Sequence, residues 1–349
     1  MLVGWRNYFF SFLLVIFAAA LPASVMAAVV KIATIAPEGS HWMREMRSGA
    51  AAIKKRTDGR IIVKYYGGGV MGNDKKVLRK IRIGQLQGGA FAASSLIERY
   101  PDIALYGLPL IFRSQAEVDY VRERFDRVLM DGLEQAGLVS FGFAGGGFAL
   151  LMSSEPAVRL DDLRGKKIWV PEGDRPSYLA MEAMNLSPVV LPISDVLTGL
   201  QTGLVDIVAT PPVGALLLQW YTKVNYVTDI PIAYSLGVMA VDKRAFDQLS
   251  EPDQQVFREV MTVTYEKLDQ TSRTDNEAAK SALQLNGLQF VQAEAESVVE
   301  WSNQVMPTNV AFWGEGDFTR ELLPQLLEML DQFRVHTEIP STSEVAAGR

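Results

Sequence analysis

The 349-residue sequence contains no cysteine and only two histidines. The missing thiols exclude a disulfide framework, a thiol nucleophile and a lipid anchor on an N-terminal cysteine. Because His41 and His336 lie at opposite ends of the chain, no histidine cluster predicts a metal site. P-loop and G-x-S-x-G motifs are also missing. We therefore predict no metal, no cofactor and no enzymatic activity. Carboxylate pairs of the glycosidase type leave no local sequence signature, so an enzyme stays open as an alternative.

Positive charge is scarce: 34 lysines and arginines stand against 40 acidic residues, which gives a formal net charge of −6. An acidic chain is poorly suited to the phosphate backbone, so nucleic acid is excluded as the main partner. Long apolar runs are missing after the N-terminal segment. No later stretch reaches the roughly 20 apolar residues that a membrane-spanning helix needs.

Residues 1–27 have the pattern of a secretory signal peptide. Arg6 is their only charge, an apolar run follows over residues 8–20, and small residues lead to Ala27. An uncleaved membrane anchor is the alternative, but the apolar run ends before Pro22, which is short for a span. We expect cleavage near Ala27 and export of the mature chain to a bacterial periplasm.

The mature chain, about 320 residues, is longer than an ordinary single domain and predicts two. Strands alternate with helices, which predicts an α/β fold with mixed, mostly parallel sheets and helices on both faces. We expect extended segments at 29–36, 61–66, 88–93, 103–111, 139–153, 166–170, 189–191, 204–210, 226–234 and 237–241. We expect helices at 41–56, 73–83, 115–136, 176–184 and 194–201, with Ser40 and Ser194 as N-caps.

A single long helix is expected from residue 251 to about 286, because the segment has apolar residues at helical spacing and no interior glycine or proline. It exceeds a typical domain helix and should run along both domains. The extended segments at 139–153 and 226–241 should form a hinge around a cleft for a small ligand. We expect these divisions: 28–150 plus about 236–250 as domain I, 151–235 as domain II, 251–340 as C-terminal helices packing across both, and 341–349 as a flexible tail.

The glycine-rich segment at 67–72 fits the G-x-G-x-x-G pattern of dinucleotide-binding sites. Such a site also needs an acidic residue about 20 positions later for the ribose hydroxyls. Residues 75–97 contain no acidic residue. We therefore interpret the segment as a turn that lets Asn73 or Asp74 cap the next helix.

A series of short segments, in their order and spacing, resembles the substrate-binding proteins of TRAP transporters. The segments are His41-Trp42-Met43, Thr57-Asp58-Gly59-Arg60-Ile61, Gly69-Val70-Met71-Gly72, Ile81-Arg82-Ile83-Gly84-Gln85-Leu86, Gly107-Leu108-Pro109-Leu110, Leu163-Arg164-Gly165-Lys166-Lys167-Ile168-Trp169-Val170-Pro171 and Leu200-Gln201-Thr202-Gly203-Leu204-Val205-Asp206. The resemblance covers essentially the whole mature chain.

This resemblance implies a two-domain periplasmic binding protein of the Venus-flytrap type, with a hinged cleft and a long domain-spanning helix. Such a protein captures one small organic solute and performs no chemistry on it. It delivers the solute to the small and large membrane permease subunits of a transporter driven by an ion gradient. Two alternatives stay open: a periplasmic enzyme of unidentified type, and a ligand-sensing subunit for a membrane receptor kinase.

The sequence departs from the TRAP family pattern where the ligand is expected. Trp169 stands where the family typically has an arginine, which pairs bidentately with a substrate carboxylate. Phe148 stands where some relatives have a second arginine. The resemblance therefore implies a subgroup without the usual carboxylate clamp, unless Arg175 supplies a displaced guanidinium.

The candidate binding residues combine aromatic rings with hydroxyl and carboxylate groups. Such a set favours a cationic, hydroxyl-rich or aromatic solute over a simple dicarboxylate or keto acid. The alternative interpretation is that the aromatics are core residues and that Glu172 and Asp174 belong to a solvated loop. The full set of candidates is Glu38, Phe91, Ser94, Phe148, Trp169, Glu172, Asp174, Arg175, Thr210, Pro211, Trp220 and Tyr234.

Overall fold

The computed structural model describes residues 27–338. Most of the expected signal peptide and the expected tail at 341–349 lie outside the described residues. The strands are β1 (Ala28–Thr34), β2 (Ile61–Tyr66), β3 (Gly88–Ala92), β4 (Leu138–Ser153), β5 (Lys167–Pro171), β6 (Ser187–Leu191), β7 (Ile207–Thr210), β8 (Tyr226–Asp242) and β9 (Gln289–Val291).

The α-helices are α2 (His41–Arg56), α3 (Asp74–Arg82), α4 (Gln115–Gln135), α5 (Leu160–Leu163), α6 (Arg175–Ala183), α7 (Val196–Thr202), α8 (Pro212–Leu217), α9 (Lys243–Phe246), α10 (Glu251–Leu285), α11 (Ala295–Glu315) and α12 (Leu322–Glu338). Short 3₁₀ helices connect some of them: η1 (Ala93–Leu96), η2 (Pro101–Gly107), η3 (Ile193–Asp195) and η4 (Trp220–Lys223).

All of the described strands belong to one mixed sheet in the order β2-β1-β3-β8-β4-β7-β5-β6, with β9 paired to β8. The pairs β1–β2, β1–β3, β5–β6, β5–β7 and β8–β9 are parallel. The pairs β3–β8, β4–β7 and β4–β8 are antiparallel. The prediction of a mixed, mostly parallel α/β fold is confirmed.

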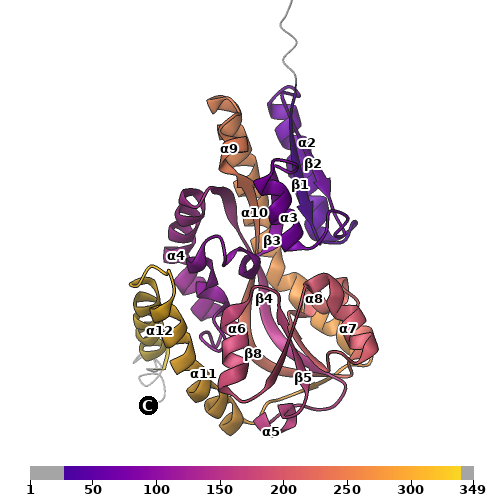
Figure 1. The fold of residues 1–349 in the computed structure, drawn as a ribbon, viewed down its shortest axis with the longest axis vertical. Coiled ribbons are helices and arrows are strands. Elements are labelled where there is room, and N and C mark those ends of the chain that lie inside the picture. The colour runs from indigo at the N-terminus through magenta and orange to yellow at the C-terminus, as the bar shows by residue number, and fades with distance from the viewer. Residues whose placement is uncertain (1–26, 339–349) are drawn as a thin grey trace, which may run out of the picture.

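Two domains share this sheet (Figure 1). The first contains β1–β3 with α2–α4, and the second contains β5–β7 with α6–α8. The long strands β4 and β8 connect them, because β8 pairs with β3 in the first domain and β4 pairs with β7 in the second. The pairing between β4 and β8 shifts register in three places, between Ser140 and Phe143, between Gly145 and Gly147 and between Ala149 and Leu151. Such irregularities bend paired strands, so the two connecting strands curve as they pass between the domains.

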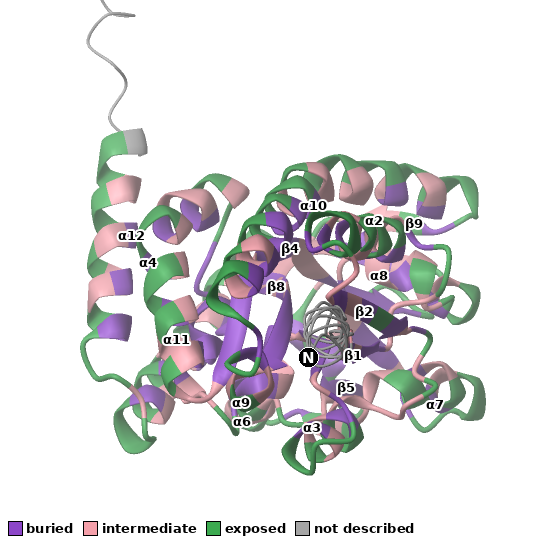
Figure 2. Cartoon of the chain, turned by 90° about the horizontal axis from the view of Figure 1, so that it is seen from above, coloured by how far each residue is buried: buried purple, intermediate pink, exposed green. Residues whose placement is uncertain are grey.

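The sheet is largely buried beneath helices whose outer faces are exposed (Figure 2). The expected long helix is confirmed as α10, which has 35 residues and begins where the Ser250 side chain accepts a hydrogen bond from the Asp253 amide, 3.3 Å away. A buried stripe that includes Phe257, Met261 and Tyr265 holds it against the core. It contacts α2 in the first domain and α8 in the second, so it spans both.

Several local predictions about caps are confirmed. Ser40 caps α2 by accepting from the Met43 amide at 3.2 Å, and Asn73 caps α3 by accepting from the Lys76 amide at 3.1 Å. Gly68 and Gly69 adopt positive φ in the turn before α3, as the turn interpretation of this glycine segment requires.

Two local predictions were wrong. Part of the segment expected to be extended at 103–111 is the 3₁₀ helix η2, which begins at Pro101 and is buried along most of its length. A short apolar run of this kind does not distinguish a buried helix from a strand. Ser194 does not cap α7: its hydroxyl donates to Asp195 Oδ1 at 2.8 Å inside η3. The extended segments expected at 226–234 and 237–241 are confirmed, and they are continuous as the single strand β8.

In the part of the chain that the structure describes, none of the helices has the length and apolar composition needed to cross a bilayer.

Candidate functional site

A cavity of about 220 Å³ lies between the two domains. The first domain contributes residues around η1 and η2, and the second contributes the ends of β5 and β7, the start of α6, and η4. Strands β4 and β8 supply the floor that joins them, through Ala149 and residues 232–236. The cavity brings together seven of the candidates predicted from sequence: Ser94, Trp169, Asp174, Thr210, Pro211, Trp220 and Tyr234.

The second-domain residues meet because β5 and β7 are parallel neighbours. Their carboxyl ends lie at the same edge of the sheet, where open α/β folds bind ligands. Strand β5 carries Trp169 and ends at Pro171, just before Asp174, while β7 ends at Thr210. Pro211 and Pro212 follow β7 at once and start α8, so the chain turns away at the cavity wall.

Two tryptophans form the wall of the cavity on the side of the second domain. Trp169 and Trp220 pack edge to face, with ring centroids 5.0 Å apart at an interplanar angle of 82°. The Trp169 indole donates to the Leu191 carbonyl oxygen at 2.9 Å, which fixes its ring against β6. Their exposed fractions are only 5% and 1%, so each ring offers one edge or face to the cavity while the rest packs in the core. The wall is therefore rigid and apolar.

Asp174 is the one acidic residue in the lining. Its side chain caps α6 by accepting from the Ser177 amide at 3.1 Å and from the Ser177 hydroxyl at 2.9 Å. Burial raises the pKa of the Asp174 carboxyl, and the hydrogen bonds from Ser177 oppose that rise. Within residues 27–338, no lysine, arginine or histidine lines the cavity to balance this carboxylate.

Four candidates lie outside the cavity lining. Phe91 is buried in the first domain, where its ring covers Gly89, and Phe148 packs edge to face on Tyr234 with centroids 5.2 Å apart. Glu38 is an exposed carboxylate paired with Arg47 at 2.6 Å, and this contact keeps its pKa low. Arg175 is the exposed first residue of α6 and does not replace a clamp inside the cavity.

Glu172 lies in a second, smaller cavity of about 90 Å³ between the domains. Its Oε2 accepts from the Asn73 side-chain amide at 3.2 Å, and its Oε1 lies 3.7 Å from Lys75 Nζ. Asn73 and Lys75 belong to the first domain and Glu172 to the second, so these contacts bridge the domains. Nearby, Asp74 accepts from the Ser95 hydroxyl at 2.6 Å, and burial raises the pKa of this carboxyl to about 6.

Sequence reasoning missed Tyr106 and Ser177, which also line the main cavity. Tyr106 was hidden in the segment expected to be extended. Ser177 lies at the position after Asp174 whose backbone amide an N-cap side chain usually accepts from. The sequence therefore does contain a pattern that could have identified it.

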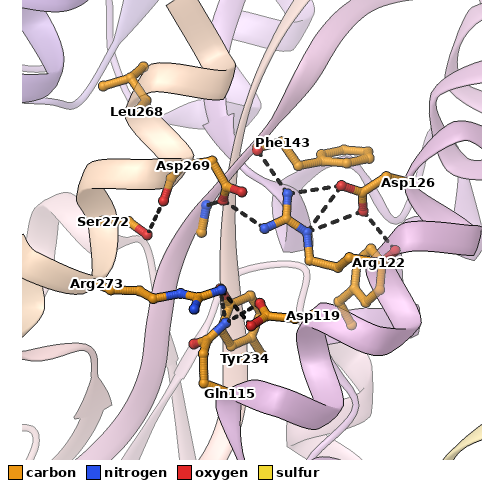
Figure 3. Close-up of polar contacts among 12 residues, drawn as sticks. Gln115, Asp119, Arg122, Asp126, Phe143, Tyr234, Leu268, Asp269, Ser272 and Arg273 are labelled. Atoms are coloured by element: carbon orange, nitrogen blue, oxygen red, sulfur yellow. Dashed lines mark hydrogen bonds and ion pairs between the residues drawn. The ribbon is translucent and has the colours of Figure 1, made fainter.

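Behind the cavity wall, a polar network joins α4, β4 and α10 (Figure 3). Its centre is Arg122, which contacts Asp126 Oδ2 at 2.9 Å and Asp269 Oδ1 at 2.6 Å and donates to the Phe143 carbonyl oxygen at 3.0 Å. Asp269 also accepts from the Gly145 amide of β4 at 2.7 Å. The network therefore fixes two helices to a strand that connects the domains.

Two tyrosines of the cavity lining form hydrogen bonds with residues of α4 through their hydroxyl groups, and Figure 3 shows Tyr234 beside Gln115. Tyr106 donates to Asp126 Oδ1 at 2.7 Å, and Tyr234 accepts from the Gln115 side-chain amide at 3.2 Å. Burial is the main reason why the pKa of both phenols is raised, so both hydroxyls remain neutral. Arg122 is outside the cavity lining, and its guanidinium is already paired with two carboxylates.

No cluster of three or more acidic, histidine or cysteine side chains in the described residues is arranged to hold a metal ion.

The family model "bacterial extracellular solute-binding protein, family 7" matches residues 32–313. The chain belongs to this family. A curated relative, the C4-dicarboxylate-binding periplasmic protein DctP of Rhodobacter capsulatus, is 24% identical over 262 residues, which is 73% of this chain and 78% of the relative. The 2,3-diketo-L-gulonate-binding periplasmic protein YiaO of Escherichia coli is 23% identical over 207 residues, 59% of this chain and 63% of that protein.

Solved structures of TRAP periplasmic solute-binding proteins share the fold of this family 7 protein. One from Pseudomonas putida F1, with bound D-glucuronate, has a TM-score of 0.77 at 20% identity and aligns with 87% of this chain and 96% of its own. One from Desulfovibrio salexigens, with bound orotic acid, has a TM-score of 0.80 at 17% identity and aligns with 87% and 99%. These likenesses confirm the two-domain α/β fold expected from the sequence.

Proposed function

We propose that this family 7 protein is the periplasmic receptor of a TRAP-type transporter, which captures a small organic solute in the cavity between its domains. The observation that carries the proposal is the cavity itself, since both domains and the two connecting strands line it. Ligand sites between domains are common, and a ligand that touches both favours the closed arrangement. The solute-bound relatives with the same fold support this assignment.

The membrane permease subunits are the proposed partners, and export through the N-terminal signal peptide is the proposed route to the periplasm. We also propose the domain limits expected from the sequence, 28–150 plus about 236–250 and 151–235. In this account the protein binds its solute and releases it chemically unchanged. A periplasmic enzyme would convert the solute, so recovery of the same compound after long incubation with the protein separates the two functions.

Removal of the bound solute should open the molecule. We expect a larger radius of gyration by small-angle X-ray scattering for protein that has been unfolded, dialysed and refolded than for protein purified natively. The physical reason is that a solute touching both domains favours the closed state by its contacts with each. Identical scattering profiles, with mass spectrometry showing that the solute has been removed, would contradict capture by domain closure.

A further inference from the structure

The composition of the cavity lining disfavours an anionic ligand. A buried carboxylate needs a cationic or strong hydrogen-bonding partner, because giving up water without one is costly. In the described part of the chain, the lining holds no basic side chain and one acid, Asp174. Arg122, in the polar network that the Tyr106 hydroxyl contacts through Asp126, is outside the cavity lining and is paired with two carboxylates.

Asp174 retains the capacity to bind a ligand. A carboxylate offers about four lone pairs, and among the described residues the two oxygens of Asp174 accept hydrogen bonds from the amide and hydroxyl of Ser177. The lining also includes Ser94 and Thr210, each of which carries a hydroxyl. The carboxylate of Asp174 can therefore accept hydrogen bonds, and the hydroxyls of Ser94 and Thr210 can donate or accept them. None of these groups carries a positive charge.

The size and walls of the cavity restrict the apolar part of the ligand. An apolar cavity of about 150 Å³ takes benzene, so about 220 Å³ accommodates one ring with a short substituent. The edge-to-face pair of Trp169 and Trp220 provides a rigid aromatic surface for such a ring.

From this geometry we infer that the solute is a small ring-bearing compound with a hydrogen-bond donor and no negative charge, and that Asp174 accepts its donor group. The inference rests on the proposed receptor function and specifies the ligand class for that cavity. It departs from the acids held by the solved relatives, because Trp169 leaves the cavity without a cationic partner for a carboxylate.

Three probes of the same ring and similar length test the inference: 2-phenylethylamine, 2-phenylethanol and phenylacetate. We expect the amine and the alcohol to bind the refolded, solute-free protein in calorimetric titrations at neutral pH, with phenylacetate at least about tenfold weaker. Equal or tighter binding of phenylacetate would overturn the inference, and so would failure of all three probes to bind at millimolar concentration. The scattering experiment on solute removal needs no knowledge of the ligand, so it tests the receptor function separately.

The variant Asp174→Asn tests the role of the carboxylate. Asparagine also caps helices well, so α6 should stay folded. We expect the amine to lose at least about tenfold in affinity and the alcohol to lose less, because a hydrogen bond to a charged group is the stronger of the two. The matched control is Asp161→Asn, whose side chain is exposed on α5 and outside the cavity lining. Equal losses for the amine and the alcohol in Asp174→Asn would overturn the assignment of this residue.

Discussion

Replacing Arg122 with methionine should lower the free energy of unfolding by about 3 kcal/mol, because removal of one member of a buried ion group leaves its partners unpaired. Arg122 is 10% exposed and neutralises Asp126 and Asp269 together. The two carboxylates are somewhat more exposed than the arginine, so we take the lower end of the range for buried pairs. Chemical denaturation followed by circular dichroism measures the loss.

A matched control lies one turn further along the same helix. Arg127 forms an i,i+4 ion pair with Asp131, but its side chain is 83% exposed. Arg127→Met should change the free energy of unfolding by less than about 0.5 kcal/mol. Similar losses in the two variants would show that the network around Arg122 does not stabilise the fold.

The loss in free energy of unfolding caused by Arg122→Met should become smaller as the pH falls. Burial raises the pKa of Asp126 while Arg122 lowers it, so the pKa of Asp126 should be still higher in the variant. An acid whose pKa is raised in the folded state binds its proton more readily there than when unfolded. The free energy of unfolding therefore increases as the pH falls through that pKa. A difference in free energy of unfolding between variant and wild type that stays constant from neutral to mildly acidic pH would contradict this explanation.

Replacing Trp169 with arginine should weaken binding of the natural solute by at least about tenfold, or about 1.4 kcal/mol. The substitution removes the edge-to-face contact with Trp220 and the hydrogen bond to the Leu191 carbonyl oxygen. It also places a positive charge at the cavity wall, where the lining otherwise holds no basic side chain among the described residues. Phenylacetate affinity should increase in this variant, as measured by calorimetry.

The control is Trp169→Phe, which keeps an apolar ring in the cavity wall and adds no charge. This variant should retain the preference for the amine and alcohol over phenylacetate. If Trp169→Arg and Trp169→Phe have the same ligand preference, the charge at this position does not set specificity.

The long elements were predictable from the sequence because their patterns persist over many residues. Helix α10 has apolar spacing and no interior glycine, and the structure extends it from Glu251 to Leu285. Short segments were less predictable. The buried run at 101–107 has no clear period, and it packs against η1, β8, α4 and α12, contacts that a local sequence pattern does not reveal.

The cavity was predictable where candidates follow the end of a parallel strand. Asp174 follows β5 and Thr210 ends β7, and both line the cavity. Phe148 was mapped to the cavity from its position in the family pattern. The paired strands β4 and β8 change register around it, and its ring packs on Tyr234. That outcome depends on strand irregularities that residue types alone do not specify.

Native mass spectrometry of the exported protein, purified without unfolding, identifies the solute in the cavity directly. We expect a small solute to be retained, to be released intact when the protein is denatured, and to be uncharged or cationic at neutral pH. Recovery of a carboxylic acid as the bound solute would show that the cavity does accept anions.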